Sequence, residues 1–143
     1  MRTISPRVLA AIALASGALA AACASIAPAI QASALAGTRW VAQLVDGRPV
    51  SAERAPQIAF TAEDRVTGSG GCNRLRGVYE AADGRIGISA LGRTEMACEP
   101  AVMRQEDAFI AVLDAATSYR QEGARLVIVA EDGRTIVLIP ASG

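Results

Sequence analysis

The chain has 143 residues, and its 14 arginines balance 14 acidic residues, so the formal net charge at pH 7 is zero. This balance argues against nucleic-acid binding, which needs a basic electrostatic footprint. The sequence contains no histidine, which excludes Ser-His-Asp and Cys-His catalysis and most transition-metal sites. We therefore expect a protein that is not an enzyme and has neither a metal nor another cofactor.

Residues 1–22 have the pattern of a secretory signal peptide. Arg2 and Arg7 give a positively charged start, and the apolar stretch 8–22 that follows is shorter than the roughly 20 residues of a membrane-spanning helix. Small residues lead up to Cys23. A buried helix is the alternative for an apolar stretch of this length, but the charge placement and the small residues favour a signal peptide.

Cys23 follows Leu19-Ala20-Ala21-Ala22, which resembles the lipobox of bacterial lipoproteins, although the leucine lies one position early. The resemblance implies a diacylated Cys23 at the mature N-terminus, and two acyl chains anchor a protein stably. The alternative is ordinary cleavage after an Ala-x-Ala site, which would leave a free thiol. Lipidation fits better, because the chain has three cysteines and lipidating one leaves a pair. The same resemblance to lipoproteins implies sorting to the outer membrane, because Ala24 rather than Asp follows the cysteine.

Residues 23–36 contain mainly Ala, Ser and Pro, carry no charge and predict a flexible tether. Such a coil would hold the following domain roughly 20 Å from its anchor. Residues 37–143 are predicted to form one domain, because no internal repeat or linker divides them.

From Thr38 onward apolar residues recur with a period of two, which predicts β-strands. Asp46-Gly47 and Asp83-Gly84 are hairpin turn signals, and 131–134 is a third. The predicted strands lie near 38–45, 58–60, 66, 72–79, 86–88, 126–130 and 135–139. The last two are apolar on both faces, so we expect a ligand, a partner or the rest of the sheet to cover their second face.

One segment has a helical period instead. Pro100 fits the first turn of a helix, and an apolar stripe follows it. A single amphipathic helix must bury its stripe against the sheet, so the sheet should curl around it. The sequence thus predicts a mainly β (α+β) fold, a small and partly closed antiparallel barrel with one helix across it. The predicted stripe is Val102, Phe109, Leu113 and Ala116, with Arg104, Asp107 and Asp114 on the opposite side.

Two short motifs carry a family resemblance. Gly70-Gly71-Cys72-Asn73 opens a strand, and Thr94-Glu95-Met96-Ala97-Cys98 precedes the predicted helix. From about Trp40 to the C-terminus the chain resembles the META/HslJ-like (DUF306-type) domain of bacterial envelope proteins. The resemblance implies the same small barrel with one helix, and a link to heat-shock and envelope-stress responses, but no defined chemistry.

Cys72 and Cys98 predict a disulfide, because the exported chain offers them no other partner and the periplasm is oxidising. Two reduced thiols are the alternative. A metal site is a weaker one, since two thiolates fall short of four ligands.

Glu106 lies within the apolar stripe of the predicted helix, where a carboxylate must be paired or hydrogen-bonded. Its functional interpretation is a general acid or a ligand contact. The structural interpretation, which we favour, is a carboxylate satisfied by an arginine or by backbone N–H groups near 72–76 or 93–94. We also favour structural roles for the motif residues Gly71, Asn73, Thr94 and Met96, because glycines and short polar side chains at turns usually serve the local backbone.

These observations predict a non-enzymatic lipoprotein of the META/HslJ-like type in the bacterial outer membrane, facing the periplasm, with a stress-related, structural or binding role. Its expected partners are the membrane, through the lipid anchor, and an envelope protein or apolar ligand, but no nucleic acid. The alternative function is a carrier that takes up a lipid or another apolar ligand inside the partly closed barrel.

Overall fold

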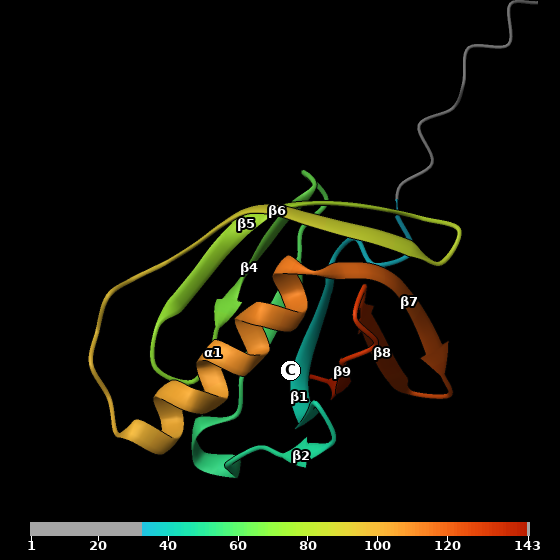
Figure 1. The fold of residues 1–143 in the computed structure, drawn as a ribbon. Helices are drawn as coiled ribbons and strands as arrows, with labels where there is room; N and C mark the ends of the chain where they lie inside the picture. The colour runs from blue at the N-terminus through green and yellow to red at the C-terminus, as the bar shows by residue number, and fades with distance from the viewer. Residues whose placement is uncertain (1–32, 143) are drawn as a thin grey trace, which may run out of the picture. The chain divides into compact units, whose positions relative to one another are not determined.

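A closed ring of eight antiparallel strands forms the body of the domain in a computed structural model that describes residues 33–142 (Figure 1). Each strand pairs with its neighbours in the order β1-β3-β4-β5-β6-β7-β8-β9, and β9 pairs with β1 to close the ring. The short strand β2 (Arg48–Pro49) adds to the free end of β1. The strands of the ring are β1 (Thr38–Val45), β3 (Gln57–Phe60), β4 (Arg65–Ser69), β5 (Arg74–Ala82), β6 (Arg85–Arg93), β7 (Ala116–Glu122), β8 (Arg125–Ala130) and β9 (Thr135–Pro140).

Tight turns join neighbouring strands where the sequence places Asp-Gly pairs. Asp46 and Gly47 have φ values of 49° and 72°, and Asp83 and Gly84 have 51° and 77°. Positive φ at both central residues matches the right-handed twist of the flanking strands, and Asp-Gly tolerates this conformation well. These turns set the register of β1 with β2 and of β5 with β6.

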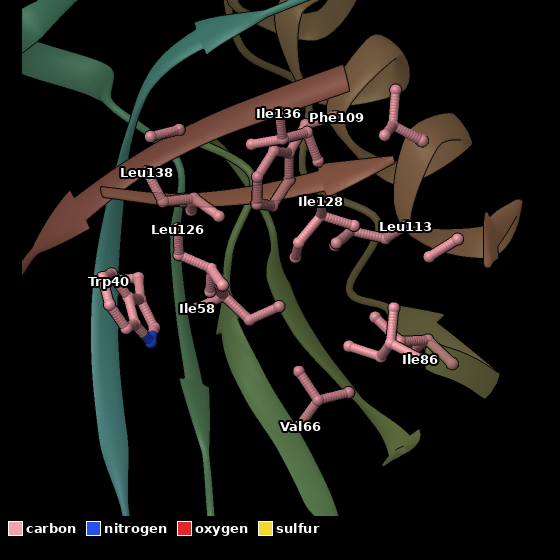
Figure 2. Packing of buried hydrophobic residues seen from close by; sticks show 14 of the residues in the cluster. Trp40, Ile58, Val66, Ile86, Phe109, Leu113, Leu126, Ile128, Ile136 and Leu138 are labelled. Carbon is pink, nitrogen blue, oxygen red and sulfur yellow. The ribbon is translucent and has the colours of Figure 1, made fainter. Parts of the chain in front are cut away.

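The helix α1 (Pro100–Asp114) packs against the barrel and buries Phe109, Val112 and Leu113. Figure 2 shows Phe109 and Leu113 beside Ile136 and Ile128, which point inward from β9 and β8. The predicted stripe is correct for Phe109 and Leu113. It is wrong at its end, because α1 stops at Asp114 and Ala116 instead begins β7.

The barrel is closed, whereas the sequence predicts one that is partly closed. Its thinnest junction lies between β6 and β7, which are joined through the register pair Arg85–Ser118 and through the Tyr119 N–H, which donates to the Gly84 carbonyl at 2.8 Å. The rest of β6 diverges from β7, and α1 contacts both β6 and β8 there. The helix therefore covers the part of the wall that strand pairing leaves thin.

Two further features refine the predicted organisation. Leu35 falls within the predicted tether, yet it is fully buried in the core, so the folded domain includes residues before 37. The predicted signal peptide 1–22 and Cys23 lie outside the described residues.

Strands β8 and β9 are apolar on both faces, as predicted. They point Leu126, Ile128, Ile136 and Leu138 into the core and leave Val129, Val137 and Ile139 half-buried on the outer surface.

Candidate functional site

The side chain of Glu106, in the middle of α1, is fully buried, as the phase of the predicted helix requires. Its Oε2 accepts hydrogen bonds from the backbone N–H groups of Cys72 at 3.1 Å and Asn73 at 2.6 Å. Its Oε1 accepts one from the Asn73 side-chain amide at 2.6 Å and a longer one from Arg93 at 3.4 Å. A carboxylate offers about four acceptor positions. All four are occupied by protein donors.

Asn73 connects this carboxylate to the Thr94–Cys98 motif. While its Nδ2 donates to Glu106, its Oδ1 accepts hydrogen bonds from the Thr94 hydroxyl at 2.9 Å and the Met96 N–H at 2.6 Å. Nδ2 also donates to the Met96 carbonyl at 3.2 Å. The Thr94 hydroxyl in turn accepts from the Arg74 N–H at 3.1 Å. The two sequence motifs therefore meet at one buried asparagine, which is 1% exposed.

Gly70 and Gly71 allow the turn after β4 to approach α1 closely. A Cβ on Gly70 would lie 2.6 Å from the Glu106 Oε2, which is closer than real Cβ contacts. Gly71 has φ of 111°, a conformation that favours glycine, and a Cβ there would lie 2.5 Å from the Arg54 carbonyl oxygen. The glycines are therefore needed for the close approach.

We expect Gly70→Ala to lower the free energy of unfolding by about 2 kcal/mol, because the added methyl group would push the Glu106 carboxylate off its donors. Gly87→Ala is the matched control. Gly87 is an exposed strand glycine, and a Cβ added there would meet nothing within 4 Å. The free energy of unfolding of the Gly87→Ala variant should therefore change by less than about 0.5 kcal/mol. Urea unfolding of both variants measures the difference, and equal midpoints would contradict the steric argument.

Arg93, at the end of β6, lies between two carboxylates of α1. Its Nη1 donates to Asp107 at 2.7 Å as well as to Glu106 at 3.4 Å. The hydrogen bond to Asp107 raises the pKa of the Arg93 guanidinium above its ordinary value. The arginine side chain is 39% exposed, so solvent weakens this pair, and its main effect is to close the outer side of the buried carboxylate.

A disulfide joins Cys72 to Cys98, with the two Cα atoms 6.0 Å apart. It links the turn before β5 to the segment before α1, directly beside the Asn73 contacts with Met96. The covalent bond and the hydrogen bonds therefore hold the same two segments together.

This geometry leaves Glu106 little capacity for chemistry. A general acid or a ligand contact needs a free lone pair or proton that faces an accessible space, and the protein donors occupy all four positions. Every buried side-chain nitrogen or oxygen in residues 33–142 has a hydrogen-bond partner. Within the same range no group of three or more His, Cys, Asp or Glu side chains is arranged to hold a metal ion. No helix in the described part of the chain is long and apolar enough to cross a membrane.

Two residues near the site make contacts that could not be assigned from the sequence. Sequence reasoning named 93–94 as a region that could face Glu106, but it did not reveal that Arg93 also pairs with Asp107. It missed Gln105, whose Oε1 accepts from the Ser51 N–H at 2.8 Å and whose Nε2 donates to the Arg54 carbonyl at 2.7 Å. A glutamine in a helix has no pattern that indicates a partner more than 50 residues away.

Together the ring of strands, the single helix and the disulfide-linked pair of motifs define a small β-barrel domain built around a buried polar network. The chain belongs to the META domain family, whose model matches residues 33–143.

Solved structures share the fold. An NMR structure of a protein from Burkholderia xenovorans is 24% identical, with a TM-score of 0.62 over 76% of this chain and 85% of that one. A crystal structure of a DUF4847-family protein from Bacteroides vulgatus is 16% identical, with a TM-score of 0.56 over 76% of this chain and 95% of that one. At these identities the likeness shows the fold alone. A search among proteins with curated descriptions found no match.

Proposed function

We propose that this protein is a non-enzymatic lipoprotein, anchored to the bacterial outer membrane through Cys23 and facing the periplasm, with a structural or binding role in the envelope. The observation that carries the proposal is the Cys72–Cys98 disulfide. Structural disulfides persist in exported proteins and are rare in the reducing cytosol. The disulfide therefore supports export, which the signal-peptide pattern of residues 1–22 also predicts.

The fully satisfied Glu106 supports a non-catalytic role, because the one buried carboxylate of the described domain has no free acceptor position. The carrier alternative, with a ligand inside the barrel, receives less support. The interior is occupied by side chains from both the sheet and α1, among them Phe60, Phe109, Leu126 and Leu138, each at most 1% exposed. A binding role would therefore use the outer surface.

The lipid anchor predicts a result in cell fractionation. Cys23→Ser should move the protein from the membrane fraction to the soluble periplasm and abolish labelling with radioactive palmitate, because serine offers no thiol for acylation. Ala24→Asp tests the membrane of residence, since it should shift the lipidated protein from the outer to the inner membrane on a sucrose gradient. A Cys23→Ser protein that stays in the membrane fraction to the same degree would refute the anchor.

The stress-related role needs a separate test. A deletion strain should survive heat or detergent shock less well than its parent, and the wild-type chain should restore survival. If the anchor matters for this role, the Cys23→Ser chain should restore it only partly at equal abundance. Equal survival of the deletion strain and its parent would remove the stress-related role and leave the anchor untouched.

A further inference from the structure

A groove of about 400 Å³ runs along the outside of the barrel, between the first half of α1 and the segment that follows β1. Figure 1 shows the lower end of α1 beside β2 and the loop after it. The volume falls within the range of small-ligand sites, roughly 300–1,000 Å³. The groove is separate from the buried Glu106 network.

Aliphatic side chains contribute to both walls of this groove, together with polar and charged side chains. Val45 and Val50 line the side of the sheet, and Ala101, Val102 and Ala108 line the side of the helix. Ala101 and Ala108 are seven residues apart, so the helix wall extends about 10 Å along the axis. No aromatic side chain of residues 33–142 lines the groove. Its walls therefore suit an extended aliphatic chain better than a ring that needs a stacking partner.

Gln105 fixes the distance between the two walls. Its side chain accepts a hydrogen bond from the Ser51 N–H at 2.8 Å and donates one to the Arg54 carbonyl at 2.7 Å. These two bonds attach the segment 51–54, which contains the short 3-10 helix η1 (Ala52–Arg54), to α1. A groove held open in this way loses little conformational entropy when a ligand enters.

The rim of the groove is basic. Arg48 and Arg104 line it from opposite walls and are exposed, and neither forms an ion pair with a carboxylate of residues 33–142. Arginine recognises carboxylates through paired N–H donors. Glu99 is the acid among residues 33–142 that lines the groove, and its charge disfavours a ligand with two negative charges.

We propose that this groove binds an amphiphilic monocarboxylate with one unbranched hydrocarbon chain, the chemistry of a fatty acid. The chain lies between the aliphatic walls, and the carboxylate pairs with Arg48 and Arg104. The inference rests on the binding role of the proposed function but does not depend on the lipid anchor. If the Cys23 experiment contradicted the lipid anchor, the binding proposal for the groove would still stand. If dodecanoate did not bind, the proposal of a lipid anchor would still stand.

The test uses the chain from residue 24 to residue 143, which contains the whole closed barrel, produced under oxidising conditions. Mass spectrometry and circular dichroism first establish that the disulfide and the fold are present. Titration calorimetry then measures binding of dodecanoate below its micelle concentration. Acetate supplies the head group without the chain, and dodecyltrimethylammonium supplies the chain with the opposite charge. Dodecanoate should bind, and neither control should bind comparably.

Variants locate the site. Arg104→Gln and Arg48→Gln should each raise the Kd for dodecanoate about tenfold, the effect of losing one charge-assisted hydrogen bond. Ala101→Phe should abolish binding by filling the groove from an exposed helix position. Arg85→Gln is the matched control, because Arg85 is an exposed arginine at the start of β6 that does not line the groove, and it should bind like the unmodified chain.

Several results would overturn the proposal. Equal binding of dodecanoate by the unmodified chain, Arg104→Gln and Ala101→Phe would place any site elsewhere. Equal affinity for the anionic and cationic amphiphiles would remove the role of the arginines. Sedimentation that shows a dimer disrupted by Ala101→Phe would assign the groove to a second copy of the chain, and binding of an apolar peptide in place of dodecanoate would assign it to a protein partner.

Discussion

Glu106→Gln should lower the free energy of unfolding by about 3 kcal/mol, because the variant replaces a buried carboxylate oxygen with a group that can only donate. Four donors face this carboxylate. In either orientation of the new amide, its nitrogen would point at two of them. Asn73 cannot relieve the conflict by turning its own amide over, since its Oδ1 already accepts from Thr94 and Met96. Urea unfolding at neutral pH measures the loss.

The neighbours of Glu106 on the exposed side of α1 serve as controls. Arg104→Ala and Asp107→Ala should each change the stability by no more than about 0.5 kcal/mol, because these side chains are exposed. If Glu106→Gln left the stability unchanged or raised it, the carboxylate would be a functional group kept at a cost in stability. That outcome would direct the search for activity back to the Asn73–Glu106 network.

Loss of the Cys72–Cys98 disulfide should have a similar effect for a different reason. The bond closes a loop with a sequence separation of 26 residues, which in the chain-entropy model stabilises the fold by about 3.5 kcal/mol. Reduction with dithiothreitol should therefore lower the Tm clearly. Thermal unfolding of the oxidised and reduced protein measures the shift.

The two cysteines should also behave as one unit in a double-mutant cycle. Cys72→Ala alone should lose most of the stabilisation, and adding Cys98→Ala should cost little more, since the bond can be broken only once. Non-reducing peptide mapping should find the two cysteines joined. Two freely alkylated thiols in the folded protein, or additive losses in the double variant, would contradict this account.

Local patterns in the sequence predicted much of the fold. The Asp-Gly turns, the period-two strands and the amphipathic helix follow from side chains within a few residues of each other. The helix phase also placed Glu106 in the interior, because that position depends on α1 alone. Strand β7 was not predicted, because five of the seven residues of Ala116–Glu122 are polar or charged and give no alternating apolar pattern. The strand forms through its pairing with β8.

The parts that the sequence did not predict depend on contacts between distant segments. The pairing of β1 with β9, which closes the barrel, joins the two ends of the domain. The groove beside α1 is lined by Gln105, which attaches the segment 51–54 to the helix through contacts that have no local sequence signature. The helical period places Arg104 on the outer side of α1, but it does not show that Arg48 lies nearby, so only the folded arrangement brings the two arginines to the same rim.

The pairing of β1 with β9 also sets the order of folding events for a chain that emerges with its N-terminus first. Both cysteines precede β7, so the disulfide can form while the last three strands are still absent. The barrel cannot close at that stage, because the partner of β1 is the last strand to appear. Until then Trp40 and Ala42, which face the core in the finished domain, lie on a strand whose β9-facing edge is unpaired. An unpaired edge of this kind invites association with other chains, so the nascent domain is exposed to aggregation until β9 arrives.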